Sequence, residues 1–533
     1  MRAHTGTDVR AAERPLLDEG RGEALMRTAA WGLAEHVAAE LRARGPVAGA
    51  TVAALVGPGN NGGDALWALA FLRRRGVEAV AVPVRRNEAG EPVWHAAGWA
   101  ALQAAGGRRS TAVPARAAVV VDAMLGTGAR GGFTLPEPAR HLPSGAAVVA
   151  CDLPSGVDAD TGAVPGEALA ADLTVTFGAS KTGLLLGAGP GRAGRVVCVD
   201  IGLGPHLPAD PAAGLHVVDD DAVARLHPVP ARDAHKYTRG VVGVVAGSER
   251  YPGAAVLAVG GVLAGGAGMA HHGGPARAGD LVLAAHPAAL TSADGPAPER
   301  ADAWVLGPGL GDGDGARERV RATVAAVLAS GADGDRGPAA LVVDASALDL
   351  VTGEDLAALA AVDARTVITP HAGEWARLRD RLPVPAADAV DVDEDGAGEL
   401  ARLRAWTAAR GVTVLLKGPA SLAVAPDGQA WLMRDGGPQL GVAGTGDVLA
   451  GALGAVLAAE TARARRGGDE RHGAARGGRP SPAALAAAAA WLHARAGVRQ
   501  AADGRATADT LPAALGDVVA RRWWENDAHG RRP

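Results

Sequence analysis

Short apolar runs alternate with longer amphipathic stretches along the whole chain, and this alternation limits the fold more than any other feature. In the first half, TVAALVG (51–57) and AAVVVDAML (117–125) are apolar almost throughout, whereas ALWALAFLRRRG (65–76) has a helical pattern. Further strand candidates are 77–84, 146–154, 172–178 and 195–202, and a longer helical stretch spans 23–45. Strands that are apolar on both faces need cover on both faces, so the pattern predicts a parallel sheet between helical layers.

The alternation stops at a Pro-, Gly- and Asp-rich segment, 202–214, and then starts again. The strand candidates of the second half are 241–248, 280–285, 303–309, 340–346, 365–370 and 412–418. Because a chain of 533 residues is long enough for more than one folding unit, we expect two α/β domains. They are predicted at 1–215 and 230–525, with a linker at 203–235. The Gly/Arg-rich stretch 462–480 is interpreted as a flexible insertion, for which a solvated loop is favoured over a nucleic-acid contact.

Composition excludes several classes of protein. Hydrophobic residues make up 48% of the chain and the formal net charge is −5, so neither disorder nor a nucleic-acid or membrane partner is indicated. Two cysteines cannot form a disulfide framework, and the N-terminus lacks the apolar core of a signal peptide, so a reducing, cytoplasmic location is expected. Residues 252–275 contain no Asp, Glu, Lys or Arg, and a buried Gly/Ala-rich helix is favoured there over a membrane span.

Lysine and asparagine are scarce, which makes the retained ones informative. The three lysines are Lys181, Lys236 and Lys417, and Asn60 and Asn61 are half of the four asparagines. A composition rich in Ala, Gly and Arg indicates a GC-rich genome, under which Lys and Asn persist where Arg or Asp cannot replace them. We therefore expect chemistry near these positions.

Three strand ends of the first half carry polar residues. GPGNNGGDALW (57–67) opens a helix after a strand, and VVVDAMLGTGARGG (119–132) and ACDLPSGVDADTG (150–162) each place an Asp just past a strand. The carboxyl ends of parallel strands meet at one edge, where open α/β sheets bind ligands. Asn61, Asp122 and Ser155 would supply oxygen ligands to a cation there, and Asp152 would remain for proton transfer. For one Asp alone, a helix cap or a turn residue is the favoured explanation, but three such strand ends together favour a shared site.

These motifs, GPGNNGGD, VDAMLGTG and DLPSG, resemble the N-terminal domain of the NAD(P)H-hydrate epimerases over about residues 10–215. The resemblance implies a Rossmann-like three-layer αβα fold that binds a hydrated nicotinamide nucleotide and a potassium ion. It implies potassium binding by Asn61, Asp122 and Ser155, and contact between Asp152 and the hydrated ring. The residues that would line the substrate are Asn60, Asn61, Gly62, Gly63, Asp64, Gly126, Thr127, Gly128, Ala129, Arg130, Gly131 and Gly132. Ala65 stands where the family usually has Gly, which a helix start tolerates.

The second half has its own polar strand ends. They are GPGLG (307–311), TPHAGEW (369–375), LLKGPAS (415–421) and the Gly-rich loop of GVAGTGDVLAGALGAVLAA (441–459). Free N–H groups at Gly444, Thr445 and Gly446 would bind an anion, and Asp447 at the helix start can take a proton from a hydroxyl. This arrangement is typical of phosphoryl transfer. An ordinary capped helix is the alternative, which the accompanying KGPAS and TPHAGE strand ends make less favoured.

Six motifs of the second half, taken in order, resemble the ADP-dependent NAD(P)H-hydrate dehydratases over about residues 230–525. The motifs are HKYTRG, YPGAA, GPGLG, TPHAGE, KGPAS and GTGD. The resemblance implies a ribokinase-like fold. The resemblance implies that Ala254, Gly309, His371 and Asp447 contact the hydrated nucleotide. The residues that would bind the adenine nucleotide are Lys417, Gly418, Pro419, Ala420, Ser421 and Gly446. Ala443 replaces a Gly usual in the family, and HPAAL (286–290) replaces a common PE-type sequence.

Together the halves predict a bifunctional enzyme for the repair of NADH and NADPH hydrates. The first domain would interconvert the R and S forms through Asp152. The second would phosphorylate the S form with ADP, using Asp447 as base and a magnesium ion to neutralise the transferred charge, and then release phosphate, AMP and NAD(P)H. The rival is a ribokinase-like small-molecule kinase fused to a non-catalytic nucleotide-binding or scaffold domain. No nucleic-acid or membrane partner is expected, and a homo-oligomer is plausible.

Overall fold

The structure is a computed structural model in which the chain divides into two compact units. One, the N-terminal unit, spans Arg2–Leu215, and the other, the C-terminal unit, spans His216–Val390 and Leu400–Pro533. The residues that the structure describes are 2–129, 131–210, 214–293, 300–332, 337–385, 398–434, 436–465, 479–505 and 507–528. Most of the expected insertion at 462–480 lies outside the described residues.

The N-terminal unit is built on a seven-stranded sheet in the order β4-β3-β2-β5-β6-β7-β9, and all its strand pairs are parallel. Its strands are β1 (Arg2–His4), β2 (Thr51–Val56), β3 (Glu78–Pro83), β4 (Arg108–Arg109), β5 (Ala117–Ala123), β6 (Ala147–Cys151), β7 (Leu173–Phe177), β8 (Ser180–Lys181) and β9 (Arg195–Val199). Its helices are α1 (Gly6–Asp18), α2 (Gly22–Arg44), α3 (Asn60–Arg73), α4 (Ala96–Ala104), α5 (Glu137–Arg140) and α6 (Pro190–Ala193). The short strand β1 pairs with β8 outside the main sheet.

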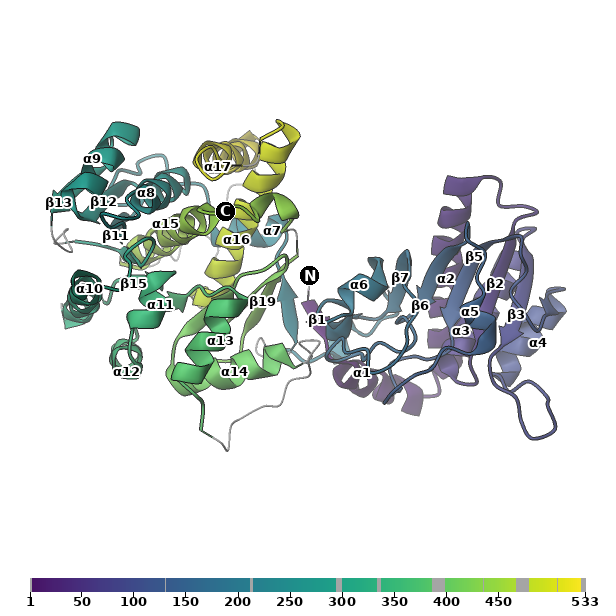
Figure 1. Ribbon diagram of the computed structural model, residues 1–533. Helices are drawn as coiled ribbons and strands as arrows, with labels where there is room; N and C mark the ends of the chain where they lie inside the picture. The colour runs from purple at the N-terminus through teal and green to yellow at the C-terminus, as the bar shows by residue number, and fades with distance from the viewer. Residues whose placement is uncertain are drawn as a thin grey trace. The chain divides into compact units, whose positions relative to one another are not determined.

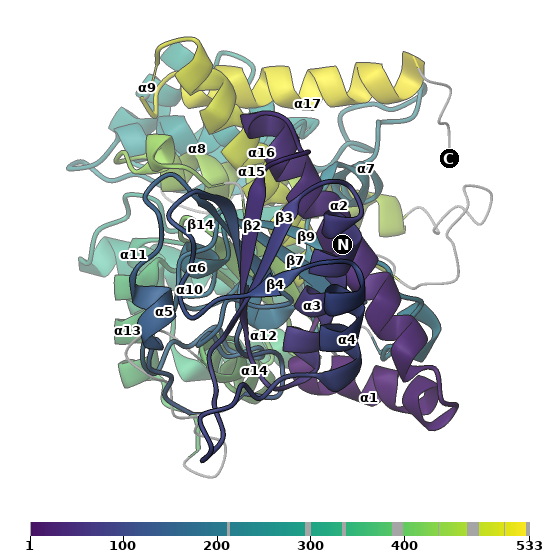
Figure 2. The same ribbon diagram turned by 90° about the vertical axis from the view of Figure 1, so that its right-hand side faces the viewer.

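The two faces of this sheet are covered differently. Every residue of β2 is buried, as the continuous apolar run predicts for a two-sided strand. One face packs against α2 and α3 in a core that includes Leu33, Leu66 and Leu69. The other face is covered by α5 and by loop residues such as Phe133 and Leu135. Figure 2 shows α3 and α4 on one side of the strands and α5 on the other.

The C-terminal unit has a larger mixed sheet, ordered β13-β12-β11-β14-β15-β16-β17-β18-β19-β10. Its strands are β10 (Leu215–Val217), β11 (Val241–Val245), β12 (Met269–Gly274), β13 (Leu290–Ala293), β14 (Ala303–Leu306), β15 (Ala340–Val343), β16 (Thr366–Ile368), β17 (Thr413–Leu416), β18 (Ser421–Val424) and β19 (Ala430–Met433). The pairs from β13 to β17 are parallel, and β17-β18-β19 are antiparallel.

Helices cover both faces of that sheet. They are α7 (Asp220–Leu226), α8 (Gly253–Ala264), α9 (Ala276–Ala285), α10 (Asp314–Ala332), α11 (Ser346–Leu350), α12 (Gly353–Ala361), α13 (Ala372–Arg381), α14 (Glu399–Arg410), α15 (Thr445–Arg465), α16 (Pro482–Ala502) and α17 (Leu511–Ala528). The main core joins α8, α15 and α16 to one face, and Figure 1 shows α10, α11 and α12 on the opposite side. This two-sided cover of a mostly parallel sheet confirms the predicted α/β class.

Two expectations about elements were wrong in the C-terminal unit. Residues 280–285, expected as a strand, form the end of α9, which buries Ala278, Gly279 and Val282 at helical spacing. A short apolar run does not distinguish a strand from a buried helix turn, and here the preceding Pro275 starts a helix. The uncharged stretch 252–275 was expected to be one helix, but it folds into α8 followed by β12. Among the described residues, no helix is long and apolar enough to cross a membrane.

Glycines let α8 and α15 approach until their backbones touch. A Cβ on Gly451 of α15 would lie 2.0 Å from the Ala258 carbonyl oxygen, and one on Gly261 of α8 would lie 2.2 Å from the Val448 carbonyl oxygen. Both distances are far below van der Waals contact with rigid backbone atoms. The close packing of the two helices therefore depends on glycine at these positions.

We expect Gly451→Ala to lower the free energy of unfolding by about 1–3 kcal/mol, because overpacking outweighs the gain in helix propensity of about 1 kcal/mol. Gly516→Ala in α17 is the matched control, because its Cβ would meet only the Ala264 Cβ, at 4.0 Å. The control should be neutral or stabilising. Urea unfolding followed by circular dichroism measures both, and equal effects of the two substitutions would contradict the packing argument.

Candidate functional sites

The N-terminal site lies where β2, β5 and β6 end. After β2 the chain turns through Gly57, whose Cβ would lie 2.0 Å from the Met124 carbonyl oxygen, so the turns after β2 and β5 are in backbone contact. The helix α3 then begins at Asn60, which is exposed. Gly62 and Gly63 are buried, and a Cβ on either would clash, with the Gly57 carbonyl or with the His95 ring. These two glycines therefore have a packing reason in addition to the predicted contact with substrate.

Asn61, Asp122 and Ser155, the three predicted cation ligands, meet around Leu125. The Asn61 Nδ2 donates to the Leu125 carbonyl oxygen (2.6 Å), and the Leu125 N–H donates to Ser155 Oγ (2.9 Å). Ser155 donates to both oxygens of the fully buried Asp122, from Oγ (2.6 Å) and from its N–H (2.8 Å). The Asn61 Oδ1 is buried without a hydrogen-bond partner in the described part of the chain. An unpaired oxygen beside a buried carboxylate and a hydroxyl forms a set of oxygen donors that could hold a cation.

Asp152, the predicted acid/base group, forms a buried ion pair with Lys181. The Lys181 side chain is 1% exposed, and its Nζ donates to Asp152 Oδ1 (2.5 Å), Thr176 Oγ1 (3.0 Å) and the Phe177 carbonyl oxygen (2.9 Å). Thr176 Oγ1 also donates to Asp152 Oδ1 (3.0 Å). All three donors of the ammonium are used, as a buried lysine requires. Asp152 has a φ of 67°, a strained conformation for a residue with a side chain, and such strain is typical of functional sites.

Two more carboxyl groups lie in the same electrostatic environment. Burial raises the pKa of Asp64 well above its usual value, and the charges of Asp152 and Glu13 raise it further. The pKa of Glu13, which α1 contributes, is also raised by burial, against the opposing charge of Lys181. Burial and the neighbouring carboxylate charges favour the protonated form of both groups, which makes them candidates for proton transfer at this edge of the sheet.

The loop after β5 contains the other predicted substrate residues. A Cβ on Gly126 would lie 3.2 Å from the Asn61 Cβ, so the loop adjoins the cation ligands. The Thr127 carbonyl oxygen accepts a hydrogen bond from Arg10 of α1 (2.5 Å), which ties the loop to that helix. Gly128, Gly131 and Gly132 are exposed and Ala129 is half-buried. Arg130 lies outside the described residues.

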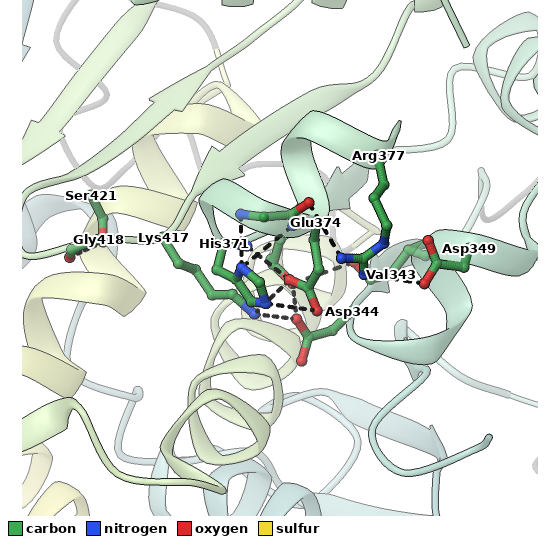
Figure 3. Close-up of polar contacts among 11 residues, drawn as sticks. Val343, Asp344, Asp349, His371, Glu374, Arg377, Lys417, Gly418 and Ser421 are labelled. Carbon is green, nitrogen blue, oxygen red and sulfur yellow. Dashed lines mark hydrogen bonds and ion pairs between the residues drawn. The ribbon is translucent and has the colours of Figure 1, made fainter. Parts of the chain in front are cut away.

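The C-terminal site is formed by the ends of β15, β16 and β17. Asp344 follows β15 and is 1% exposed, and its Oδ1 accepts hydrogen bonds from Lys417 Nζ (2.6 Å) and Thr369 Oγ1 (2.7 Å). His371 caps α13 through Nδ1, which accepts the Gly373 N–H (3.0 Å). Figure 3 shows Lys417, His371 and Asp344 directed toward one another from three strand ends. Lys417 therefore has a fixed counter-ion at the same edge of the sheet.

Asp447 lies in the first turn of α15 and carries the clearest electrostatic signature. Burial and the charge of Asp344 raise its pKa, against the opposing charge of Lys417, to about 7. A Cβ on Gly446 would lie 3.6 Å from Lys417 Nζ, so the lysine ammonium faces the start of the helix. A carboxyl group with a pKa near 7 is suited to accept a proton at physiological pH.

One detail of the predicted anion loop needs correction. Of the three N–H groups expected to be free, that of Thr445 donates to the Val442 carbonyl oxygen (3.3 Å). Thr445 Oγ1 donates back to the carbonyls of Leu440 (2.8 Å) and Val442 (2.9 Å), so this residue closes the loop. The positive charge available to an anion there comes from the later amides of the first turn and from Lys417.

The remaining predicted residues of the C-terminal unit fall into two groups. Ala254 opens α8 next to Gly309, where an added Cβ would lie 2.6 Å from that of Ala254. Gly309 also has a φ of 66°, which favours glycine. The residues of the β17–β18 turn, Gly418, Pro419 and Ala420, are exposed. Ser421 closes that turn by donating to the Gly418 carbonyl oxygen (3.2 Å).

Sequence reasoning did not assign Lys181, Asp344 or Glu13 to a site. Lys181 was singled out by its rarity but given no role, and the structure pairs it with Asp152. Asp344 closes an apolar run in VVDAS as Asp122 does in VVVDAM, and this parallel could have revealed it. Glu13 lies in an amphipathic helix before the first main strand, and no motif distinguishes it.

We expect Lys181→Met to lower the free energy of unfolding by about 3–5 kcal/mol, because it leaves the Asp152 carboxylate buried without its counter-ion. Lys236→Met is the matched control, since Lys236 is exposed and its Nζ lies 5.0 Å from the Tyr237 ring centroid. The control should change stability by about 0.5 kcal/mol or less. Urea unfolding followed by circular dichroism tests this, and similar losses in the two variants would contradict a buried pair.

Comparison with known proteins finds similar families and relatives for both halves of the chain. The family of NAD(P)H-hydrate dehydratases matches residues 242–521, and the family described as YjeF-related protein N-terminus matches residues 22–183. A bifunctional NAD(P)H-hydrate repair enzyme of Mycobacterium tuberculosis is 41% identical over 465 residues, 86% of this chain and 89% of that relative. An NAD(P)H-hydrate epimerase of Clavibacter michiganensis is 44% identical over 215 residues, 38% of this chain and 90% of that protein.

Among solved structures, an ADP/ATP-dependent NAD(P)H-hydrate dehydratase from Bacillus subtilis, co-crystallised with ATP and Mg²⁺, is similar at 23% identity with a TM-score of 0.43. The match covers 58% of this chain and 98% of the Bacillus chain. The family assignment rests on the sequence relatives, which extend over both units. The chain belongs to the family of bifunctional NAD(P)H-hydrate repair enzymes.

Proposed function

We propose that this chain restores hydrated NADH and NADPH to the reduced cofactors in two steps. Residues 1–215 would interconvert the R and S hydrates, and residues 230–525 would dehydrate the S hydrate at the expense of ADP, with release of AMP and phosphate. The observation that carries the proposal is Asp447, whose pKa near 7 combines with Lys417 at the start of a helix that can bind phosphate. Membership of the repair-enzyme family supports the same assignment.

In the N-terminal unit, Asp152 is the proposed acid/base group. Lys181 and Thr176 both contact its Oδ1, which fixes the orientation of the carboxylate. Asp64, whose pKa burial raises well above its usual value, is the proposed donor of the proton that the hydroxyl takes up as it leaves the ring carbon. Water would then add to the opposite face of the ring as a carboxylate takes up its proton. The exchange of faces needs one donor and one acceptor, which these carboxyl groups supply.

We propose that Asn61, Asp122 and Ser155 hold a potassium ion. The fit rests on the buried Asn61 Oδ1 that lacks a hydrogen-bond partner among the described residues, and on the oxygen donors beside it. Such an ion would supply positive charge for the substrate phosphates or the leaving hydroxyl. The loop of residues 126–132 adjoins these ligands and is proposed, with residues 60–64, to line the substrate.

In the C-terminal unit, Asp447 is the proposed base. It would take the proton of the ring hydroxyl as the hydroxyl oxygen attacks the terminal phosphorus of ADP, and the phosphoanhydride bond to AMP would break. Loss of phosphate from the ring and of a proton from the adjacent carbon would then restore the dihydronicotinamide. Lys417, Gly418–Ser421 and Gly446 are proposed to bind the nucleotide, and Ala254, Gly309 and His371 to contact the hydrate. Phosphorylation is required because hydroxide is a poor leaving group and phosphate a good one.

Magnesium is proposed to accompany the nucleotide and neutralise charge on the transferred group. Within the described ranges, no group of three or more His, Cys, Asp or Glu side chains could hold a metal ion. That observation fits an ion bound chiefly through the phosphates, as Mg²⁺ often is.

Supplying mixed R and S hydrates with ADP tests both activities, because regeneration of the reduced nicotinamide can be followed directly by its absorbance. We expect Asp447→Asn to abolish recovery, since the hydroxyl proton has no acceptor. Asp152→Asn should allow recovery of the S fraction at the normal rate and then stall. Each variant leaves the other unit intact and so controls for folding.

Spontaneous epimerisation is subtracted with a blank that contains only a dehydratase of the single-domain type. No recovery by the unaltered chain would contradict the dehydratase assignment, and an unaltered chain that stalls after the S fraction would contradict the epimerase assignment. A stable phosphoester formed with ATP, without return of NAD(P)H, would favour the small-molecule kinase.

The pKa of Asp447 sets a pH dependence for dehydration. Because the base must be ionised, kcat/KM for the S hydrate at saturating ADP should be constant above pH 7 and fall by about tenfold per unit below it. A pH–rate profile measures this acidic limb, the pH range in which kcat/KM falls as the pH is lowered. A limb near pH 4, the range of an unperturbed carboxyl group, would contradict Asp447 as the base in this environment.

A further inference from the structure

Asp344 lies next to the proposed base but has no part in the chemistry described so far. It is 1% exposed, and both the Lys417 ammonium (2.6 Å) and the Thr369 hydroxyl (2.7 Å) donate to its Oδ1. Figure 3 shows this carboxylate below Lys417, with Glu374 nearby. Two donors on one oxygen give the carboxylate a single orientation, and the ammonium is held in turn.

The charged and titratable groups around Asp447 come from four elements. Asp344 and Lys417 follow β15 and β17, and Glu374 of α13 lies 3.9 Å from the Lys417 Nζ. His371 Nε2 lies 3.6 Å from the second oxygen of Glu374. On α16, His493 contacts the Thr445 carbonyl oxygen (2.9 Å), and burial lowers its pKa to about 4, so it is neutral. Asp344 and Lys417 are the charges that act on Asp447, and they act in opposite directions.

We propose that Asp344 is a positioning residue of the dehydratase: it holds the Lys417 ammonium at the start of α15 and thereby sets the pH at which Asp447 becomes a base. The inference rests on the proposed function of the C-terminal unit.

The physical reason is competition for the ammonium. Without Asp344, the Lys417 ammonium would be left to Glu374, 3.9 Å away, and to Asp447. Its charge lowers the pKa of Asp447, so the base would become a weaker proton acceptor. Because Asp344 pairs with the ammonium and adds a negative charge of its own, Asp447 retains a proton affinity suited to neutral pH. The same contact keeps the ammonium 3.6 Å from the position of a Gly446 Cβ, where the phosphate of a nucleotide would approach.

The test is the acidic limb of kcat/KM for the S hydrate, measured at saturating ADP and Mg²⁺ across roughly pH 5.5 to 9. Asp344→Asn should move the limb to lower pH by about one unit. Lys417→Met should move it to higher pH, although its rate is lower because nucleotide binding suffers. Thr369→Val removes the hydroxyl but neither charge, so it is the matched control and should leave the limb in place even where the rate falls.

The double variant Asp344→Asn/Lys417→Met guards against a failure of the single variant to fold, because removal of a whole buried ion pair is tolerated better than removal of one partner. Its limb should lie below that of Lys417→Met alone, which isolates the charge of Asp344. The proposal would be overturned if kcat/KM fell at the same pH in the double variant as in Lys417→Met. It would also be overturned if kcat/KM fell at the same pH in Asp344→Asn as in the unaltered chain. An unaltered chain that does not regenerate NAD(P)H with ADP would instead contradict the proposed function.

Discussion

A buried lysine–aspartate ion pair occupies the carboxyl edge of the sheet in each unit, and the proposed chemistry depends on it. Removing an ammonium and a carboxylate from water costs several kcal/mol per ion, and only close pairing with further hydrogen bonds offsets that cost. Lys181 and Lys417 both have such surroundings, with a threonine hydroxyl bound to the same aspartate oxygen in each case. The pairs place fixed charge where parallel strands end and ligands bind.

Most of the fold could be predicted from the sequence because strands buried on both faces leave a clear pattern. The runs that became β2, β5 and β15 are apolar almost throughout and bounded by turn residues. The error at 280–285 has a physical cause: in α9 the apolar residues serve a helix with one buried side, and six residues are too few to show that period. The strand β12 was missed because Met269–Gly274, with two histidines and two glycines, has little of the β-branched character of the others.

The candidate sites could be located from sequence but their electrostatics could not. Motifs placed Asn61, Asp122 and Ser155 together, and the structure connects them through Leu125, which hydrogen-bonds Asn61 and Ser155, and through the bond from Ser155 to Asp122. The partner of Lys417 is 73 residues away in the chain, and no local spacing reveals a contact over that distance. The rarity of lysine marked both buried ammonium groups, because arginine is too large and too rigid to replace either without loss of the geometry.

The contact between α8 and α15 limits how the C-terminal site can respond to its ligands. Ala254 lies in the first turn of α8, and Asp447 lies in the first turn of α15. Since the two backbones touch at Gly261 and Gly451, neither helix can slide along the other without a steric clash. The proposed hydrate contact Ala254 and the proposed base Asp447 therefore belong to one rigid block. Any closure around the proposed nucleotide would therefore require elements other than this block to move, such as the exposed β17–β18 turn that joins two antiparallel strands.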